Sequence, residues 1–297
     1  MIKLTKFYKI IKVPSKKKVL GFLMCFFSFW ILFAASCARM RISDKEANQD
    51  FAKKSIKVSF LNQDVKGFNL HYVKVGSDTL PTLFFIHGSP GSWDAFKEYM
   101  LDSSLLAKYR MISIDRPGFG YSDFGDAKDL PTNSKLISSV IQKENNNKPL
   151  HLIGHSIGGP IVIQLAQDNP NSFGSLTILA GSISPIDEPK EYWRYFVHYS
   201  PVKWLWPGAF RPSNAEIIYF KKDLKRLDTG YARITMPVMF IHGSADKFVS
   251  IKNVYYGLTK LASNKMVRTI IIPNANHFIP WQHYQEIKSH LLHLSDK

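Results

Sequence analysis

The sequence predicts an α/β fold, with a mostly parallel eight-stranded sheet and helices on both faces. Short, continuous apolar runs alternate with stretches that can form helices, and each run leads into a loop. Strands with continuous apolar character are typical of parallel sheets, because helices cover both faces. The 297 residues are 45% apolar, enough for the core of one large domain.

The chain begins with a basic segment followed by an apolar one. Residues 1–18 contain seven lysines and no acid, and residues 19–36 contain no charge. A positive flank before an apolar run is typical of an export signal. As a helix, residues 19–36 would be about 27 Å long, slightly less than the roughly 30 Å hydrocarbon core of a bilayer. Residues 1–36 are therefore predicted to be a signal or anchor segment.

Small residues lead from this run directly into Cys37. The segment resembles the lipobox of bacterial lipoproteins, although Ala34 stands where that pattern most often has Leu. The resemblance implies an exported protein of the cell envelope whose Cys37 is lipidated and becomes the mature N-terminus. An uncleaved single-pass anchor over residues 19–36 and an ordinary cleaved signal peptide are the alternatives. Residues 37–54 are polar, mixed in charge and without apolar periodicity, which predicts a tether.

Residues 55–297 are predicted to form the folded domain. Apolar and polar side chains alternate over 56–60 and 68–72, which predicts an antiparallel hairpin. Continuous apolar runs predict further strands at 82–86, 111–114, 150–153, 176–179, 238–241 and 269–272. Helices are expected at 92–106, 130–144, 157–168, 251–262 and 279–294.

One connection is too long for an ordinary loop. More than fifty aromatic-rich residues separate the strand at 176–179 from the next, so we expect a helical cap inserted at about 182–235, after the sixth strand. Aromatic residues in such an insertion usually form its own small core. The alternative is that some of them line an apolar pocket or contact lipid, with basic neighbours suited to anionic headgroups. The aromatic candidates are Tyr192, Trp193, Trp204 and Trp206, and the basic ones are Lys190, Arg194 and Lys203.

A G-x-S-x-G motif lies between a predicted strand and a predicted helix. It reads Gly154-His155-Ser156-Ile157-Gly158, directly after the apolar run at 150–153. A strained turn between strand and helix would hold the serine hydroxyl clear of the sheet, with glycines where side chains would collide. Ser156 is therefore the candidate nucleophile.

Candidate partners for Ser156 follow two later strands. A serine hydroxyl needs a base to take its proton, and the base needs an acid to orient it. Asp246 lies in the loop after the strand at 238–241, and His277 lies in the loop after the last strand. Because parallel strands end at one edge of the sheet, Ser156, Asp246 and His277 are predicted to meet there.

The loop after the strand at 82–86 predicts an oxyanion hole. It reads His87-Gly88-Ser89-Pro90-Gly91, and its glycines let the backbone turn back toward the nucleophile. We expect the backbone N–H groups of Ser89 and Ile157 to be the two donors. His87 and Gly88 are expected to support this loop, as Gly154 and Gly158 support the elbow.

From about residue 55 onward the chain resembles the α/β-hydrolase fold family, in its branch of esterases, epoxide hydrolases and prolyl aminopeptidases. The residues that carry the resemblance are 87–91, 115–122, 154–159, Asp246 and His277. It implies a Ser156-His277-Asp246 triad, with 115–122 a structural loop beside the site and the cap over it. Family epoxide hydrolases use Asp as nucleophile, so Ser156 disfavours that activity. The motif at Gly88-Ser89 departs from the two glycines usual in prolyl aminopeptidases, which weakens that interpretation.

These residues favour a membrane-tethered serine hydrolase of small-molecule carboxylic esters. An amide or peptide hydrolase is a second hypothesis; acids in the cap would then bind a substrate ammonium. The candidate acids are Asp187, Glu188, Glu191 and Glu216. A non-catalytic binding protein on the same scaffold is a third, although each triad position is occupied.

Composition excludes other classes. The net charge of +16 could indicate nucleic-acid binding. Seven of these charges belong to the leader lysines, however, which leaves +9 for the rest of the chain, and no basic-aromatic stripe is present. Two cysteines, Cys25 and Cys37, are too few for a disulfide framework or a cysteine zinc site. Neither a metal-ligand motif nor a phosphate-binding glycine loop occurs, so no cofactor is expected.

Overall fold

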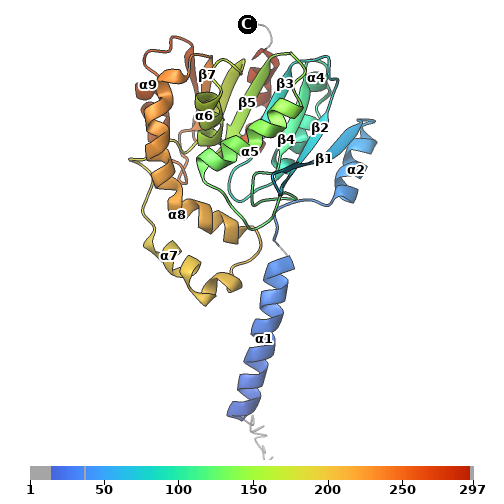
Figure 1. The fold of residues 1–297 in the computed structure, drawn as a ribbon, viewed down its shortest axis with the longest axis vertical. Helices are drawn as coiled ribbons and strands as arrows, with labels where there is room; N and C mark the ends of the chain where they lie inside the picture. Colours follow the sequence, from blue (N-terminus) through green and yellow to red (C-terminus); the bar gives the residue numbers. More distant parts are fainter. Residues whose placement is uncertain (1–14, 37, 295–297) are drawn as a thin grey trace, which may run out of the picture.

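The computed structural model describes residues 15–36 and 38–294. The predicted lipidation site, Cys37, lies outside the described residues. The fold is the expected α/β arrangement, with an eight-stranded sheet at its centre and one long N-terminal helix that projects from the body (Figure 1).

The sheet has the strand order β1-β2-β4-β3-β5-β6-β7-β8. Its strands are β1 (Val58–Val65), β2 (Phe68–Val75), β3 (Thr82–Ile86), β4 (Arg110–Ile114), β5 (Leu150–His155), β6 (Ser175–Leu179), β7 (Val238–Gly243) and β8 (Val267–Ile272). The predicted hairpin is β1 and β2, and β2 also pairs antiparallel with β4. All other pairs are parallel. The carboxyl ends of β3 to β8 therefore form one common edge.

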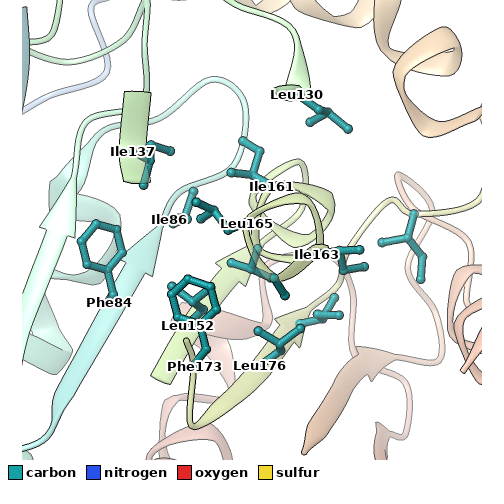
Figure 2. Packing of buried hydrophobic residues seen from close by; sticks show 14 of the residues in the cluster. Phe84, Ile86, Leu130, Ile137, Leu152, Ile161, Ile163, Leu165, Phe173 and Leu176 are labelled. Atoms are coloured by element: carbon teal, nitrogen blue, oxygen red, sulfur yellow. The ribbon is translucent and has the colours of Figure 1, made fainter. Parts of the chain in front are cut away.

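Two apolar cores lie on opposite faces of the sheet. On one face, α5 (Leu130–Lys143), α6 (Gly158–Asp168) and α9 (Lys252–Lys260) pack on the strands. Figure 2 shows Phe84 and Leu152 of the sheet packed toward Ile161 and Leu165 of α6. On the other face the helices are short: η1 (Trp93–Phe96), α3 (Lys97–Met100), α4 (Ser103–Leu106), α10 (Ile279–Gln282) and α11 (Tyr284–Leu292). The prediction of helices on both faces is confirmed.

Two expected helices are interrupted. The stretch 92–106 forms η1, α3 and α4 instead of one helix, because the Asp102 side chain accepts the backbone N–H groups of Ser104 and Leu105 and starts a new helix there. The stretch 279–294 is divided at His283 into α10 and α11.

The segment predicted to be a tether contains a packed helix. Residues Asp44–Lys53 form α2, whose N-cap Ser43 accepts the N–H of Glu46. Phe51 of this helix is buried and stacks on Trp93 at 6.3 Å between ring centroids. Only Ala47 and Phe51 of the ten residues are buried, too few for the apolar periodicity that reveals an amphipathic helix.

The predicted cap follows β6, as expected. It comprises α7 (Tyr192–Tyr199), η2 (Pro201–Leu205), α8 (Phe210–Leu227) and η3 (Asp228–Arg233). Phe220, Leu224 and Leu227 on α8 join the core over α5 and α6. The cap aromatics therefore divide between packing and exposure, since Tyr192 and Trp204 remain exposed.

The N-terminal helix α1 (Lys16–Ser36) includes a 19-residue candidate span, Lys16–Ala34. Its length and apolar composition would allow it to cross a membrane, and a signal sequence has the same properties. Its apolar side chains are largely exposed, including Phe22 and Phe29. The end of α1 nearest the body contacts the cap (Figure 1), where Trp30 Nε1 donates to the carbonyl of Leu205 at 2.9 Å.

Candidate active site

Ser156 lies in a strained turn between β5 and α6. Its φ of +55° is in the left-handed region that L residues seldom adopt. A Cβ on Gly154 would lie 2.2 Å from the carbonyl oxygen of Gly158, and a Cβ on Gly158 would lie 2.3 Å from that of Ile86. Glycine is therefore required at both predicted supporting positions, and the turn holds Ser156 at the carboxyl edge of the sheet.

Asp246 and His277 are joined by a hydrogen bond at the same edge. His277 Nδ1 lies 2.7 Å from Asp246 Oδ2, in the loops after β8 and β7. Asp246 Oδ1 also accepts the backbone N–H groups of Phe248 and Val249, each at 2.9 Å. Because the carboxylate fixes the proton on Nδ1, Nε2 of His277 is left as the basic nitrogen.

The surroundings of Asp246 favour its charged form. Burial alone would raise the pKa of this carboxyl, but the hydrogen bonds from His277 and the backbone N–H groups outweigh it and lower the pKa below its ordinary value. Asp246 is therefore a carboxylate at neutral pH, suited to stabilising a cationic His277.

His277 lies against the residue that precedes Ser156. Its carbonyl oxygen accepts from His155 Nε2 at 3.1 Å, and the two imidazole centroids are 4.9 Å apart. Burial lowers the pKa of His155 to about 3, so this ring stays neutral. Within the described residues no hydrogen bond joins Ser156 to His277; the hydrogen bond between a nucleophile and its base often forms only when a substrate binds.

The loop after β3 lies directly over Ser156. A Cβ on Gly88 would lie 3.0 Å from Ser156 Cβ, so the backbone passes close to the hydroxyl. Across the described part of the chain, the backbone N–H groups of Ser89 and Ile157 have no hydrogen-bond acceptor. Two unpaired amides beside a serine hydroxyl are the arrangement that an oxyanion hole needs.

His87 is buried and holds this loop in place. Its Nε2 accepts the backbone N–H of Arg116 at 3.0 Å, so Nδ1 carries the proton and donates to the carbonyl of Gly88 at 2.7 Å. Burial holds the pKa of His87 well below its ordinary value, and the nearby Arg116 cation lowers it further. The ring is neutral and supports the loop, as expected of it.

A buried ion pair that the sequence did not reveal links the cap to the loop 87–91, which is called the oxyanion loop below after its predicted role. Arg116 Nη1 and Nη2 lie 2.8 and 3.1 Å from the two carboxylate oxygens of Glu216 on α8. The Arg116 side chain is fully buried and that of Glu216 is 5% exposed. Arg116 Nη2 also donates to the carbonyl of Gly88 at 3.0 Å. Glu216 thereby fixes both the cap and the loop that carries Ser89.

The remaining loop of the predicted motif set, 115–122, is organised by one buried carboxylate. Asp115 accepts the backbone N–H groups of Trp93 and Tyr121 at 2.7 and 2.8 Å, and His71 Nδ1 lies 2.7 Å from it. This is the structural role that the resemblance implies.

The four acids considered for a substrate ammonium are engaged elsewhere. Glu216 pairs with Arg116, and Glu191 pairs with Arg194 at 2.5 Å. Glu188 and Asp187 accept the hydroxyls of Ser182 and Ser184 at 2.9 and 2.6 Å.

Exposed aromatic rings surround His277. Phe248 lies 5.7 Å from the His277 ring between centroids and 5.9 Å from Phe278. Phe278 in turn lies 6.1 Å from Trp281, and all three rings are at least 44% exposed. This apolar rim would suit an apolar substrate group.

Among residues 15–36 and 38–294, no group of three or more His, Cys, Asp or Glu side chains is placed to hold a metal ion. A cavity of about 610 Å³ lies at the opposite edge of the sheet, where Pro81, Pro149 and Pro237 precede β3, β5 and β7. It does not include the predicted triad.

Comparison with known proteins agrees with this architecture. Residues 81–206 match a family model described as the alpha/beta hydrolase fold. Epoxide hydrolase 1 of Caenorhabditis elegans is 31% identical over 115 residues, 38% of this chain and 28% of that protein. A 2-hydroxy-6-oxononadienedioate/2-hydroxy-6-oxononatrienedioate hydrolase of Escherichia coli O81 (strain ED1a) is 32% identical over 131 residues, 41% of this chain and 44% of that protein.

The chain thus spans less than half the length of these curated relatives. Among solved structures, an epoxide hydrolase crystallised without ligand aligns with a TM-score of 0.64 and 18% identity, over 80% of this chain and 98% of that one. The sheet topology, the family model over residues 81–206 and the solved structure agree that the chain has the α/β-hydrolase fold.

Proposed function

We propose that the protein is a serine hydrolase that forms an acyl-enzyme on carboxylic esters with an apolar acyl or alcohol group. Its body is held at a membrane by the N-terminal segment. The observation that carries this proposal is Ser156 in a strained elbow, beside a hydrogen-bonded His277–Asp246 pair and two unpaired backbone amides.

In the first step, Ser156 Oγ attacks the ester carbonyl carbon and its proton passes to His277 Nε2. The carbonyl oxygen becomes an oxyanion that accepts from the N–H groups of Ser89 and Ile157, each donor worth about 3 kcal/mol. Asp246 stabilises the imidazolium formed. When the intermediate collapses, the ester C–O bond breaks and the alcohol leaves with the proton from His277.

In the second step, water attacks the acyl-enzyme. His277 Nε2 accepts a proton from the water as its oxygen bonds to the acyl carbon. The bond to Ser156 then breaks, Ser156 regains its proton from His277, and the carboxylic acid is released. One ester and one water yield one acid and one alcohol.

The relatives' activities are less well supported here. An epoxide opened by Ser156 Oγ would leave an ether on the enzyme, which an activated water does not cleave. The E. coli relative's name specifies a dicarboxylate substrate, which calls for free cations near the elbow. Arg116, the buried cation beside the loop 87–91, is already neutralised by Glu216.

Amide hydrolysis at a substrate amino terminus would call for a cap carboxylate free to bind the ammonium. Each of the four candidate cap acids already has a cationic or hydroxyl partner. Ester hydrolysis requires no such group, and the aromatic rim of Phe248, Phe278 and Trp281 favours apolar substrates.

The experiment is a substrate panel on the purified full chain in detergent. We expect hydrolysis of p-nitrophenyl esters, faster than that of amino-acid arylamides, and loss of at least 1,000-fold in Ser156→Ala. Ester hydrolysis that persists in Ser156→Ala would contradict the proposed nucleophile. Arylamides cleaved faster than esters would contradict the ester assignment.

The attachment is tested separately. If Cys37 carries the lipid, Cys37→Ala abolishes metabolic labelling with a radioactive fatty acid. If labelling is absent and membrane retention persists in Cys37→Ala, the apolar segment 19–36 is the anchor instead. Release of the body from the membrane in both the wild type and Cys37→Ala would contradict membrane attachment.

A further inference from the structure

The anchor segment and the cap are connected by hydrogen bonds. The backbone N–H of Gly208 donates to the carbonyl of Ala34 at 2.7 Å, and that of Ala209 donates to the carbonyl of Ala38 at 2.9 Å. These two acceptors lie on either side of position 37 in the sequence. A membrane anchor in this segment would therefore hold the body with its cap beside the membrane.

The same segment continues along the carboxyl edge of the sheet. Ser92 Oγ, in the loop after β3, donates to the carbonyl of Met40 at 2.7 Å. Tyr121, in the loop after β4, donates through its hydroxyl to the carbonyl of Ile42 at 2.9 Å. Because β3 and β4 end at the edge that holds Ser156, the catalytic edge and the anchor lie on the same side of the body (Figure 1).

The cap presents an aromatic surface on this side. Four of its rings are well exposed: Tyr192 at 73%, Phe196 at 66%, Tyr199 at 67% and Trp204 at 50%. The helix α7 that carries the first three packs against η2, and η2 packs against α1. We define these four residues as the cap aromatic surface. Exposed aromatic rings that gather on one surface favour an interaction site, and Trp and Tyr favour membrane–water interfaces.

Cations accompany these rings. Lys203 Nζ and Arg211 Cζ lie 5.3 and 5.1 Å from the centroid of Trp204, and Arg194 Cζ lies 4.5 Å from that of Trp193. Basic groups beside aromatic rings match the headgroup region of an anionic bilayer. This charge, together with the adjoining anchor, selects a bilayer over a second protein as the occupant.

We propose that the cap aromatic surface rests on an anionic lipid bilayer, so that Ser156 hydrolyses amphiphilic esters lying in that bilayer. This inference rests on the proposed function and names its substrate class.

The first test compares two substrates on full chain reconstituted in phosphatidylcholine/phosphatidylglycerol vesicles. One is p-nitrophenyl palmitate dissolved in the bilayer, and the other is p-nitrophenyl acetate in water. In the double variant Phe196→Asp/Trp204→Asp we expect palmitate hydrolysis to fall at least tenfold and acetate hydrolysis to stay within twofold. The matched control, Tyr255→Asp, alters an exposed ring on α9, away from α1 (Figure 1), and should change neither rate.

The outcomes separate this inference from the proposed function. Acetate hydrolysis that does not depend on Ser156 would contradict the proposed function. Ser156-dependent acetate hydrolysis with palmitate hydrolysis unchanged in the double variant would overturn the membrane-facing cap alone. If the double variant lost both activities, the following measurement, which needs no activity, decides.

The second test places a nitrobenzoxadiazole fluorophore on Phe196→Cys or Tyr255→Cys, both in a Cys25→Ser background whose own labelling is subtracted. Vesicles contain lipids with nitroxide on the headgroup, which quench only fluorophores close to the bilayer. We expect quenching at position 196 at least fivefold stronger than at position 255. Equal quenching at the two positions would overturn the proposal. Self-quenching at position 196 without nitroxide quenching would also overturn it and would assign the surface to a second copy of the chain.

Discussion

The buried pair between Arg116 and Glu216 gives a quantitative prediction. The Arg116 side chain is fully buried and, within residues 15–36 and 38–294, makes its two carboxylate contacts only with Glu216, at 2.8 and 3.1 Å. Glu216→Gln keeps the shape of the side chain and removes its charge, leaving a buried cation without a counterion. Breaking a buried pair in this way typically costs about 3–5 kcal/mol.

We therefore expect Glu216→Gln to lower the free energy of unfolding by about 3–5 kcal/mol. For a domain of this size, this corresponds to a decrease in Tm of about 6–20 °C. The measurement is thermal and urea unfolding of the full chain in detergent, followed by circular dichroism. Because Arg116 also holds the carbonyl of Gly88 at 3.0 Å, kcat should fall as well, by up to about 100-fold.

The matched control is Glu191→Gln. Glu191 contacts Arg194 at 2.5 Å on the same cap, but its side chain is 32% exposed. Removing this solvated pair should cost less than about 1 kcal/mol. If Glu216→Gln were no more destabilising than Glu191→Gln, the ion pair would not be what joins the cap to the oxyanion loop.

Three further predictions concern the elbow, acid stability and the aromatic rim. Gly154→Ala should lower the free energy of unfolding in urea by about 3 kcal/mol, because its Cβ would lie 2.2 Å from Gly158 O. The control Gly67→Ala has open space around its Cβ and should cost only about 1 kcal/mol, for its positive φ. Equal costs in the two variants would contradict the steric argument. Burial lowers the pKa of His151 from 6.5 to about 4. Between these pH values His151 binds a proton only in the unfolded chain. About 3 kcal/mol of stability should therefore be lost as the pH falls through this range. His155, whose pKa is lowered to about 3, contributes to the same range, so His151→Leu should reduce the slope of the stability–pH curve there without removing it. An unchanged slope would contradict the role of His151. Phe248→Ala should raise KM for long-chain esters relative to short ones while changing stability by less than about 0.5 kcal/mol, and a KM unchanged for both chain lengths would remove the rim from substrate binding.

The sheet could be predicted because its strands are buried on both faces. Runs such as Thr82–Ile86 are fully buried in the structure, so apolar character persists at every position and the strand is visible in a single sequence. The same order of strands and loops places Ser156, Asp246 and His277 at one edge. The G-x-S-x-G motif together with this order of strands and loops is why their common edge could be predicted.

Helices with few buried residues could not be predicted. Only Ala47 and Phe51 anchor α2, and the rest of the helix is solvated, so the pattern resembles a linker. The break before α4 depends on the Asp102 side chain, which caps two backbone amides. Apolar periodicity does not reveal such a cap.

The contacts that couple the site to the cap were also invisible in the sequence. Arg116 and Glu216 are 100 residues apart, and each occurs in a segment with other charges. Nothing local distinguishes the buried Glu216 from the more exposed Glu191 of the same cap, so the sequence offers both as candidates for binding a substrate ammonium. Only the packing of α8 on the loop after β4 shows that its charge is already neutralised.

The central claim is that Ser156 is the nucleophile of a serine hydrolase. The most direct measurement is the intact mass of the full chain after treatment with a fluorophosphonate, which reacts only with an activated serine. We expect one adduct per chain in the wild type and in Ser89→Ala, whose backbone N–H is unchanged, and none in Ser156→Ala. An unlabelled wild type, or an adduct that persists in Ser156→Ala, would contradict it.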